Sequence, residues 1–86
     1  MSGEIKLQGE ALILGSGAAN PKAEEILRRA LEPFVHQVKE VQRIDLGGRT
    51  IIALLIALDP NHFLAIESDL VASGEAAGLD VALELL

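Results

Sequence analysis

The sequence contains no cysteine, no tryptophan and no tyrosine, and only two phenylalanines. Without cysteine, the chain has no disulfide, no thiolate zinc site and no cysteine nucleophile. No aromatic residue falls in the segments that we expect to be strands, so the stacking surface of RNA-recognition domains is lacking. Apolar residues nevertheless make up 50% of the chain, which is typical of a folded protein with an aliphatic core.

Positive charge is also scarce, and the net charge is −6. An acidic chain is repelled by nucleic-acid phosphates and by anionic membrane surfaces. The longest apolar run, IIALLIAL, has 8 residues, whereas a membrane-spanning helix needs about 20. The start, MSGEIKLQGE, lacks the apolar segment of a signal peptide. We therefore expect a cytoplasmic protein with neither a nucleic-acid nor a membrane partner.

The periodicity of the apolar residues predicts four strands and two helices in the order βαββαβ. Gly47-Gly48 indicates a two-residue hairpin between the second and third strands, and the alternation breaks near Lys39, where we expect a bulge. This order is typical of the ferredoxin-like α+β fold, a four-stranded antiparallel sheet with both helices on one face. The predicted strands are 10–16, 35–46, 49–58 and 79–86, and the helices follow Asn20-Pro21 and Asp59-Pro60. Residues 10–86 form one domain, after a flexible lead-in over 1–9.

The third predicted strand, RTIIALLIAL, carries apolar side chains on both sides. Only one side can face the helices. The other side would leave an aliphatic patch of a kind that soluble monomers avoid. The sequence therefore predicts self-association or docking onto a partner domain.

The stretch ALILGSGAANPKAEEIL runs from an apolar strand through glycines into a helix. Gly15 and Gly17 match the first half of the dinucleotide-binding pattern G-x-G-x-x-G, but Asn20 replaces its third glycine, and the chain is short for two mononucleotide-binding halves. A second interpretation is a tight turn in which the glycines adopt positive φ. Asn20 is in either case a good N-cap, with Pro21 at the first helical position.

A third interpretation comes from resemblance. The stretches VQRIDLGGRTIIALLIALDP and DLVASGEAAGLDVALEL resemble ACT domains, and most closely the N-terminal ACT domain of actinobacterial phosphoserine phosphatases. The resemblance runs from about residue 10 to the C-terminus. It implies a regulatory domain that senses a small amino acid, serine first and glycine second, in an enzyme of L-serine biosynthesis.

ACT domains of this kind carry a G-x-D-x-P-G loop that binds the amino and carboxylate groups of the ligand. Here Gly17 and Pro21 match, Ala19 stands in place of the acid, and Lys22 stands in place of the last glycine. Lys22 could attract a carboxylate, and Asn20 could supply the missing acceptor. The resemblance thus assigns Gly15, Gly17, Ala19, Asn20 and Lys22 as ligand-binding residues. The departures leave a second hypothesis open, a dimerisation or docking module with a degenerate ligand loop.

Catalytic and metal-binding residues are not expected. The D-x-D-x-T segment and magnesium site of such a phosphatase are absent, so they would lie outside this chain, which we expect to be no enzyme by itself and to need no cofactor. The only histidines, His36 and His62, are expected at the surface rather than on a metal.

Overall fold

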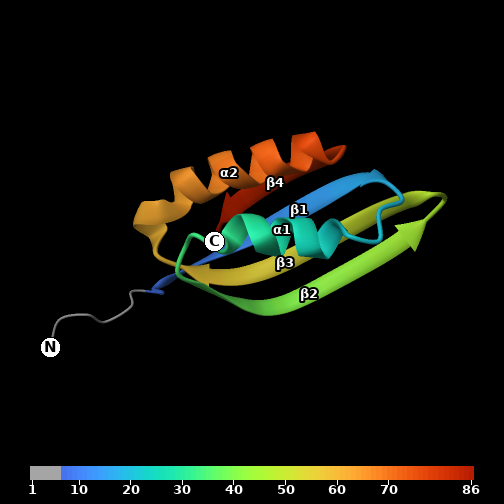
Figure 1. Cartoon of the computed structure of the whole chain (residues 1–86). Coiled ribbons are helices and arrows are strands. Elements are labelled where there is room, and N and C mark those ends of the chain that lie inside the picture. The colour runs from blue at the N-terminus through green and yellow to red at the C-terminus, as the bar shows by residue number, and fades with distance from the viewer. Residues whose placement is uncertain (1–6) are drawn as a thin grey trace, which may run out of the picture.

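The computed structural model describes residues 7–86 and shows one antiparallel sheet with two helices on the same side (Figure 1). Along the sheet the strands lie in the order second, third, first, fourth, which confirms the predicted ferredoxin-like βαββαβ fold and puts the first and third strands at the centre. The elements are β1 (Gly9–Ala18), α1 (Ala23–Leu31), β2 (His36–Leu46), β3 (Arg49–Leu58), α2 (Phe63–Ala76) and β4 (Leu79–Leu85), with a short 3-10 turn over Pro60–His62.

The predicted hairpin and bulge are both present. Gly47 and Gly48 have φ angles of 59° and 76°, and this left-handed pair closes the two-residue turn between β2 and β3. The pairing of β2 with β3 shifts between Val38 and Glu40, so Lys39 is the bulged residue. The bulge changes which side of β2 faces the helices, as the broken alternation indicated.

The tight-turn interpretation of the glycines in the first stretch is wrong. Gly15 and Gly17 are regular residues of β1, which continues to Ala18, and neither has a positive φ. A Cβ on Gly17 would collide with the carbonyl oxygen of Gly78. A Cβ on Gly15 would lie 3.2 Å from Cγ2 of Ile52. These glycines permit close packing across the sheet rather than a turn.

The start of α1 also differs from the prediction. The helix begins at Ala23, and Lys22 holds the cap position without a side-chain cap bond. Asn20 lies earlier, where its Oδ1 accepts a hydrogen bond of 2.9 Å from the backbone N–H of Lys22. Asn20 therefore stabilises the turn before the helix rather than capping the helix itself.

The core lies between the helices and one face of the sheet. Its largest members are fully buried: Ile13, Leu27, Leu31, Ile52, Leu54, Ile56, Leu58, Ile66 and Leu70. Gly74 lets α2 approach β4, because a Cβ there would meet Val81. Leu85 pairs with the buried Ala11 and so lies on the helix face of the sheet, but it is 44% exposed because it ends the edge strand β4.

Within residues 7–86, the opposite face of the sheet carries no helix. Leu14, Ile51 and Ile44 are 45%, 42% and 52% exposed there. No helix within residues 7–86 has the length and hydropathy to cross a bilayer. The lead-in predicted over residues 1–9 lies largely outside the described residues, and β1 begins at Gly9.

Candidate functional site

The segment from Ala19 to Lys22 connects β1 to α1 beside the β2–β3 hairpin. The backbone N–H of Ala19 donates to the carbonyl oxygen of Gly48 over 2.9 Å. The backbone N–H of Asn20 donates to the hydroxyl of Thr50 over 3.0 Å. The segment is thus fastened to the hairpin by its own backbone.

Arg43 completes this attachment from β2. Its Nη2 donates to the carbonyl oxygen of Asn20 over 2.7 Å. The same guanidinium donates to both carboxylate oxygens of Asp45, over 2.9 and 3.1 Å. The buried hydroxyl of Thr50 in turn donates to Asp45 over 2.8 Å. The backbone N–H, the carbonyl oxygen and the side-chain oxygen of Asn20 all have partners within the chain.

The charges in this network stabilise each other. The hydrogen bond from Arg43 lowers the pKa of Asp45 most, and the bond from Thr50 lowers it further. The hydrogen bond to Asp45 correspondingly raises the pKa of Arg43. Both groups therefore stay ionised at neutral pH, and the network serves to hold the segment in place.

No role at this site was predicted for Arg43, Asp45 and Thr50, although the sequence contains a signal for it. A two-residue turn at Gly47-Gly48 places position 45 opposite position 50. Arg43 lies two residues before Asp45, hence on the same face of β2. A polar triad beside the end of β1 could have been derived from that register.

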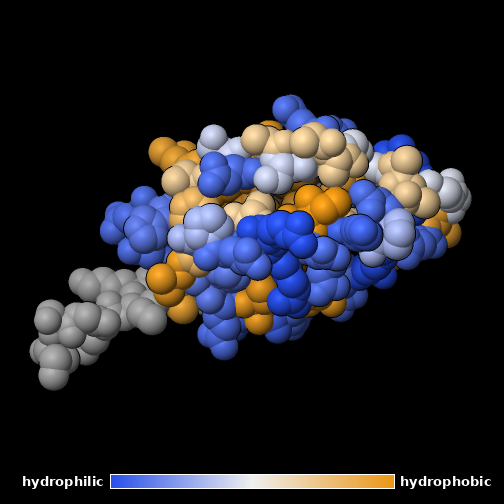
Figure 2. Space-filling view, viewed as in Figure 1, coloured by the Kyte–Doolittle hydropathy of each residue, from blue (hydrophilic) through white to orange (hydrophobic). Residues whose placement is uncertain are grey.

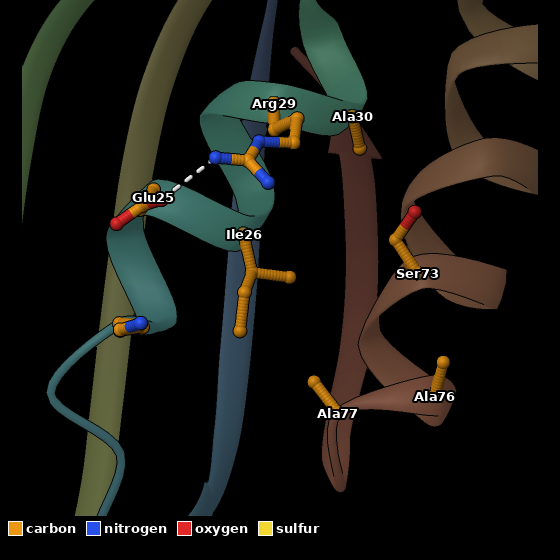
Figure 3. Close-up of a pocket in the computed structure, with 8 residues that line it drawn as sticks. Glu25, Ile26, Arg29, Ala30, Ser73, Ala76 and Ala77 are labelled. Atoms are coloured by element: carbon orange, nitrogen blue, oxygen red, sulfur yellow. Dashed lines mark hydrogen bonds and ion pairs between the residues drawn. The ribbon is translucent and has the colours of Figure 1, made fainter.

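A groove of about 470 Å³ separates α1 from α2 (Figure 3). Its lining residues are Lys22, Glu25, Ile26, Arg29, Ala30, Ser73, Ala76 and Ala77. The side chain of Ile26 points between the helices, and Ser73 faces it from α2 (Figure 3). In the space-filling view hydrophilic side chains gather over α1, and an apolar strip runs between the helices (Figure 2).

The groove carries charge only at the α1 side. Glu25 and Arg29 form an exposed i,i+4 ion pair of 2.8 Å. Lys22 lies where the chain enters α1 and belongs to none of the salt bridges found in residues 7–86. An apolar floor with the ammonium group of Lys22 and the Arg29-paired carboxylate of Glu25 at its rim offers a charged partner to each end of a small zwitterion.

The structure separates the five residues that the resemblance assigned. Gly15 and Gly17 are buried in β1, Ala19 is exposed in the connecting segment, and Asn20 is partly buried there. Lys22 alone of the five lines the groove between the helices. The ligand stretch predicted around residues 15 to 22 is therefore not one continuous surface.

Metal ligands do not gather in the part of the chain that the structure describes, where no three His, Asp or Glu side chains come together. His36 is partly buried, with Nδ1 2.8 Å from the carbonyl oxygen of Phe34. His62 is exposed, as predicted.

No family model matches the sequence, and no curated protein matches it either. Solved structures do resemble it. An ACT domain protein from Streptococcus pneumoniae superimposes with a TM-score of 0.78 at 10% identity, over 90% of this chain and 89% of that one. A putative glycine cleavage system transcriptional repressor gives 0.80 at 15% identity, over 91% and 46% of the two chains.

A formyltetrahydrofolate deformylase from Pseudomonas putida KT2440 gives a TM-score of 0.75 at 17% identity. The match covers 87% of this chain but only 28% of the deformylase. This chain therefore spans less than a third of the deformylase and about half of the repressor. Identities this low carry information about architecture alone. The chain has the ferredoxin-like fold of ACT domains.

Proposed function

We propose that this chain is a regulatory domain that binds a small amino acid in the groove between α1 and α2, with L-serine as the first candidate and glycine as the second. The observation that carries the proposal is the combination of Lys22, Glu25 and Ser73 around an apolar floor. The fold supports it, since an ACT domain protein is among the similar structures.

Each part of a zwitterion has a partner of suitable chemistry in this groove. Lys22 would attract the carboxylate at the start of α1, where the helix dipole also favours an anion. Glu25 would accept from the ammonium group. The hydroxyl of Ser73 offers a hydrogen bond to a short polar side chain, and Ala76 and Ala77 leave an apolar wall. A ligand that prefers one arrangement of neighbouring domains would then shift the activity of the assembly.

The partner of such regulation would be an enzyme of serine metabolism. Residues 41–60 and 69–85 resemble the ACT domain of phosphoserine phosphatases, which supports a phosphatase of this class as the parent protein. The nucleophile and the magnesium site would lie in another domain. We therefore expect this chain, incubated with phosphoserine and Mg²⁺, to release no phosphate; turnover abolished by a single Asp substitution would contradict this.

Isothermal titration calorimetry with L-serine and glycine tests the groove. We expect saturable binding to the wild type and at least about tenfold weaker binding to Lys22→Ala, because the carboxylate loses its charged partner. Arg28→Ala is the matched control, since Arg28 is a cation on α1 that pairs with Glu24 and does not line the groove. Binding that Lys22→Ala leaves unchanged, or an absence of heat with every amino acid tested, would refute amino-acid sensing at this groove.

The attachment of residues 19–22 favours a second candidate, a docking module that binds no amino acid. Ala19 offers no side-chain acceptor, and the backbone groups of Asn20 are already hydrogen-bonded. Calorimetric silence in a folded, self-associated domain would support this second function.

A further inference from the structure

The face of the sheet opposite the helices has an apolar centre and a polar rim. Its centre lies on the two middle strands, with Leu12 and Leu14 on β1 and Ile51, Ala53 and Leu55 on β3. Ile44 on β2 and Ala82 on β4 extend it to the outer strands. The charged rim consists of Glu10, Lys39, Glu40, Arg49, Asp80 and Glu84.

We propose that this open face binds a second copy of the chain, with the two sheets packed face to face about a twofold axis that runs along the strands between β1 and β3. This self-association does not depend on whether the groove between the helices binds an amino acid.

The alternation of large and small side chains on the open face supports the binding of a second copy there. In the sheet register Leu14 lies directly between Ala53 on β3 and Ala82 on β4. A twofold axis along the strands places Leu14 over the partner's Ala53 and places the partner's Leu14 over Ala53. Each Leu14 then fills the depression above an alanine, whereas Leu12 lies over the partner's Leu55 in a leucine-on-leucine contact. The surface is complementary to itself, as a symmetric dimer requires.

A twofold axis across the strands fits less well. It would place Leu14 against the partner's Leu14 and Ala53 against the partner's Ala53. The leucines would hold the sheets apart and leave a void over the alanines, which close packing disfavours.

The size of the face predicts the strength of the dimer. From Arg49 to Ala57 the sheet is about 27 Å long, and four strands make it about 19 Å wide, roughly 500 Å² in plan before side-chain relief is counted. A standard stable interface buries about 800 Å² per partner. The face falls short of that area, so we expect only a weak, reversible dimer with a dissociation constant of about 1–100 µM.

The rim adds a measurable electrostatic signature. In the proposed packing Glu84 of each copy lies toward the partner's Glu40, so like charges meet at both edges of the interface. Screening by salt reduces this repulsion. Added NaCl should therefore strengthen the dimer slightly, and Glu84→Gln should strengthen it at low salt.

Sedimentation equilibrium from 1 µM to 1 mM, without added amino acid, tests the inference. We expect a monomer–dimer equilibrium in the wild type and a monomer in Leu14→Lys, because the interface centre would bury an unpaired charge. Leu64→Lys is the matched control, since Leu64 is 76% exposed on α2, away from the open face. Circular dichroism confirms that each variant is folded.

Three outcomes would overturn the inference. The wild type could remain a monomer at every concentration, which would leave the face to another domain. Leu64→Lys could abolish association as fully as Leu14→Lys, which would place the contact on the helices. Association could also weaken with added salt, which would mean that opposite charges rather than apolar side chains hold the copies together.

Discussion

The two sides of β3 both carry aliphatic side chains but have different surroundings. Along β3, Ile52 and Leu54 are fully buried under the helices. Ile51, on the other face of the same strand, is 42% exposed. The helices α1 and α2 make most of this difference, because both sides of RTIIALLIAL carry aliphatic side chains; the open side differs in having smaller residues, Ala53 and Ala57. Such a strand stabilises the fold through one face and offers the other for binding.

The largest expected effect is the difference in unfolding free energy between two leucine-to-alanine substitutions, one on each face of β3. Leu54→Ala should lower the free energy of unfolding by about 3 kcal/mol, because it leaves a cavity in the closed core. Leu55→Ala, one residue along and only partly buried, should cost less than about 1 kcal/mol in the monomer. Urea unfolding at a protein concentration below the dimer range measures both.

The same pair of variants also detects association. At high protein concentration the cost of Leu55→Ala should grow, whereas the cost of Leu54→Ala should stay constant. Association stabilises the folded state by an amount that rises with the logarithm of the protein concentration, and only Leu55→Ala changes the surface that associates. Equal costs for both substitutions at low concentration would contradict the assignment of the faces.

A smaller effect distinguishes the two glycines of β1. Gly17→Ala should destabilise the domain by about 2 kcal/mol, because the new Cβ would collide with the backbone carbonyl oxygen of Gly78. A backbone atom cannot move aside by a change of rotamer, as a side chain can. Gly15→Ala should cost less than about 1 kcal/mol, since its neighbour is a side-chain methyl group of Ile52 that can shift. Thermal unfolding compares them, and equal losses would mean that the close approach at Gly17 is not the constraint.

The smallest effect concerns Asp45 and depends on pH. Because its pKa is lowered in the folded state, Asp45 adds stability above the pKa of an unfolded Asp, about 3.9. That stability is lost as the pH falls through the lower folded value. The difference in unfolding free energy between wild type and Asp45→Asn should be constant from about pH 7 to 5 and shrink below about pH 4. Asp69→Asn, an exposed substitution on α2, should show a smaller difference at pH 7; a pH-independent difference for Asp45→Asn would refute the linkage.

The order of elements, the hairpin and the bulge were predictable because each depends on local signals. Gly47-Gly48 fixes a two-residue turn, and the broken alternation around Lys39 marks the irregular pairing. The role of Gly15 and Gly17 was not predictable locally, since their constraint is the approach of Gly78 and Ile52 from distant parts of the chain.

The candidate site was also predictable only where it depends on local sequence. Lys22 was identified from the sequence, but its neighbours Ser73 and Ala77 lie some fifty residues away and meet it only through the packing of α2 against α1. The hydrogen bonds that Asn20 makes with Arg43 and Thr50 could not be predicted either, because they depend on how β1, β2 and β3 pair with one another.

An amide chemical-shift titration of the isotopically labelled domain with L-serine tests most directly that the two sides of the sheet have different roles. We expect saturable shifts around Lys22, Ile26, Ser73 and Ala77, with the amides of Leu14 and Ile51 unchanged at constant protein concentration. An absence of saturable shifts in the groove, or shifts confined to the open face, would contradict an amino-acid site between the helices and a separate association surface opposite them.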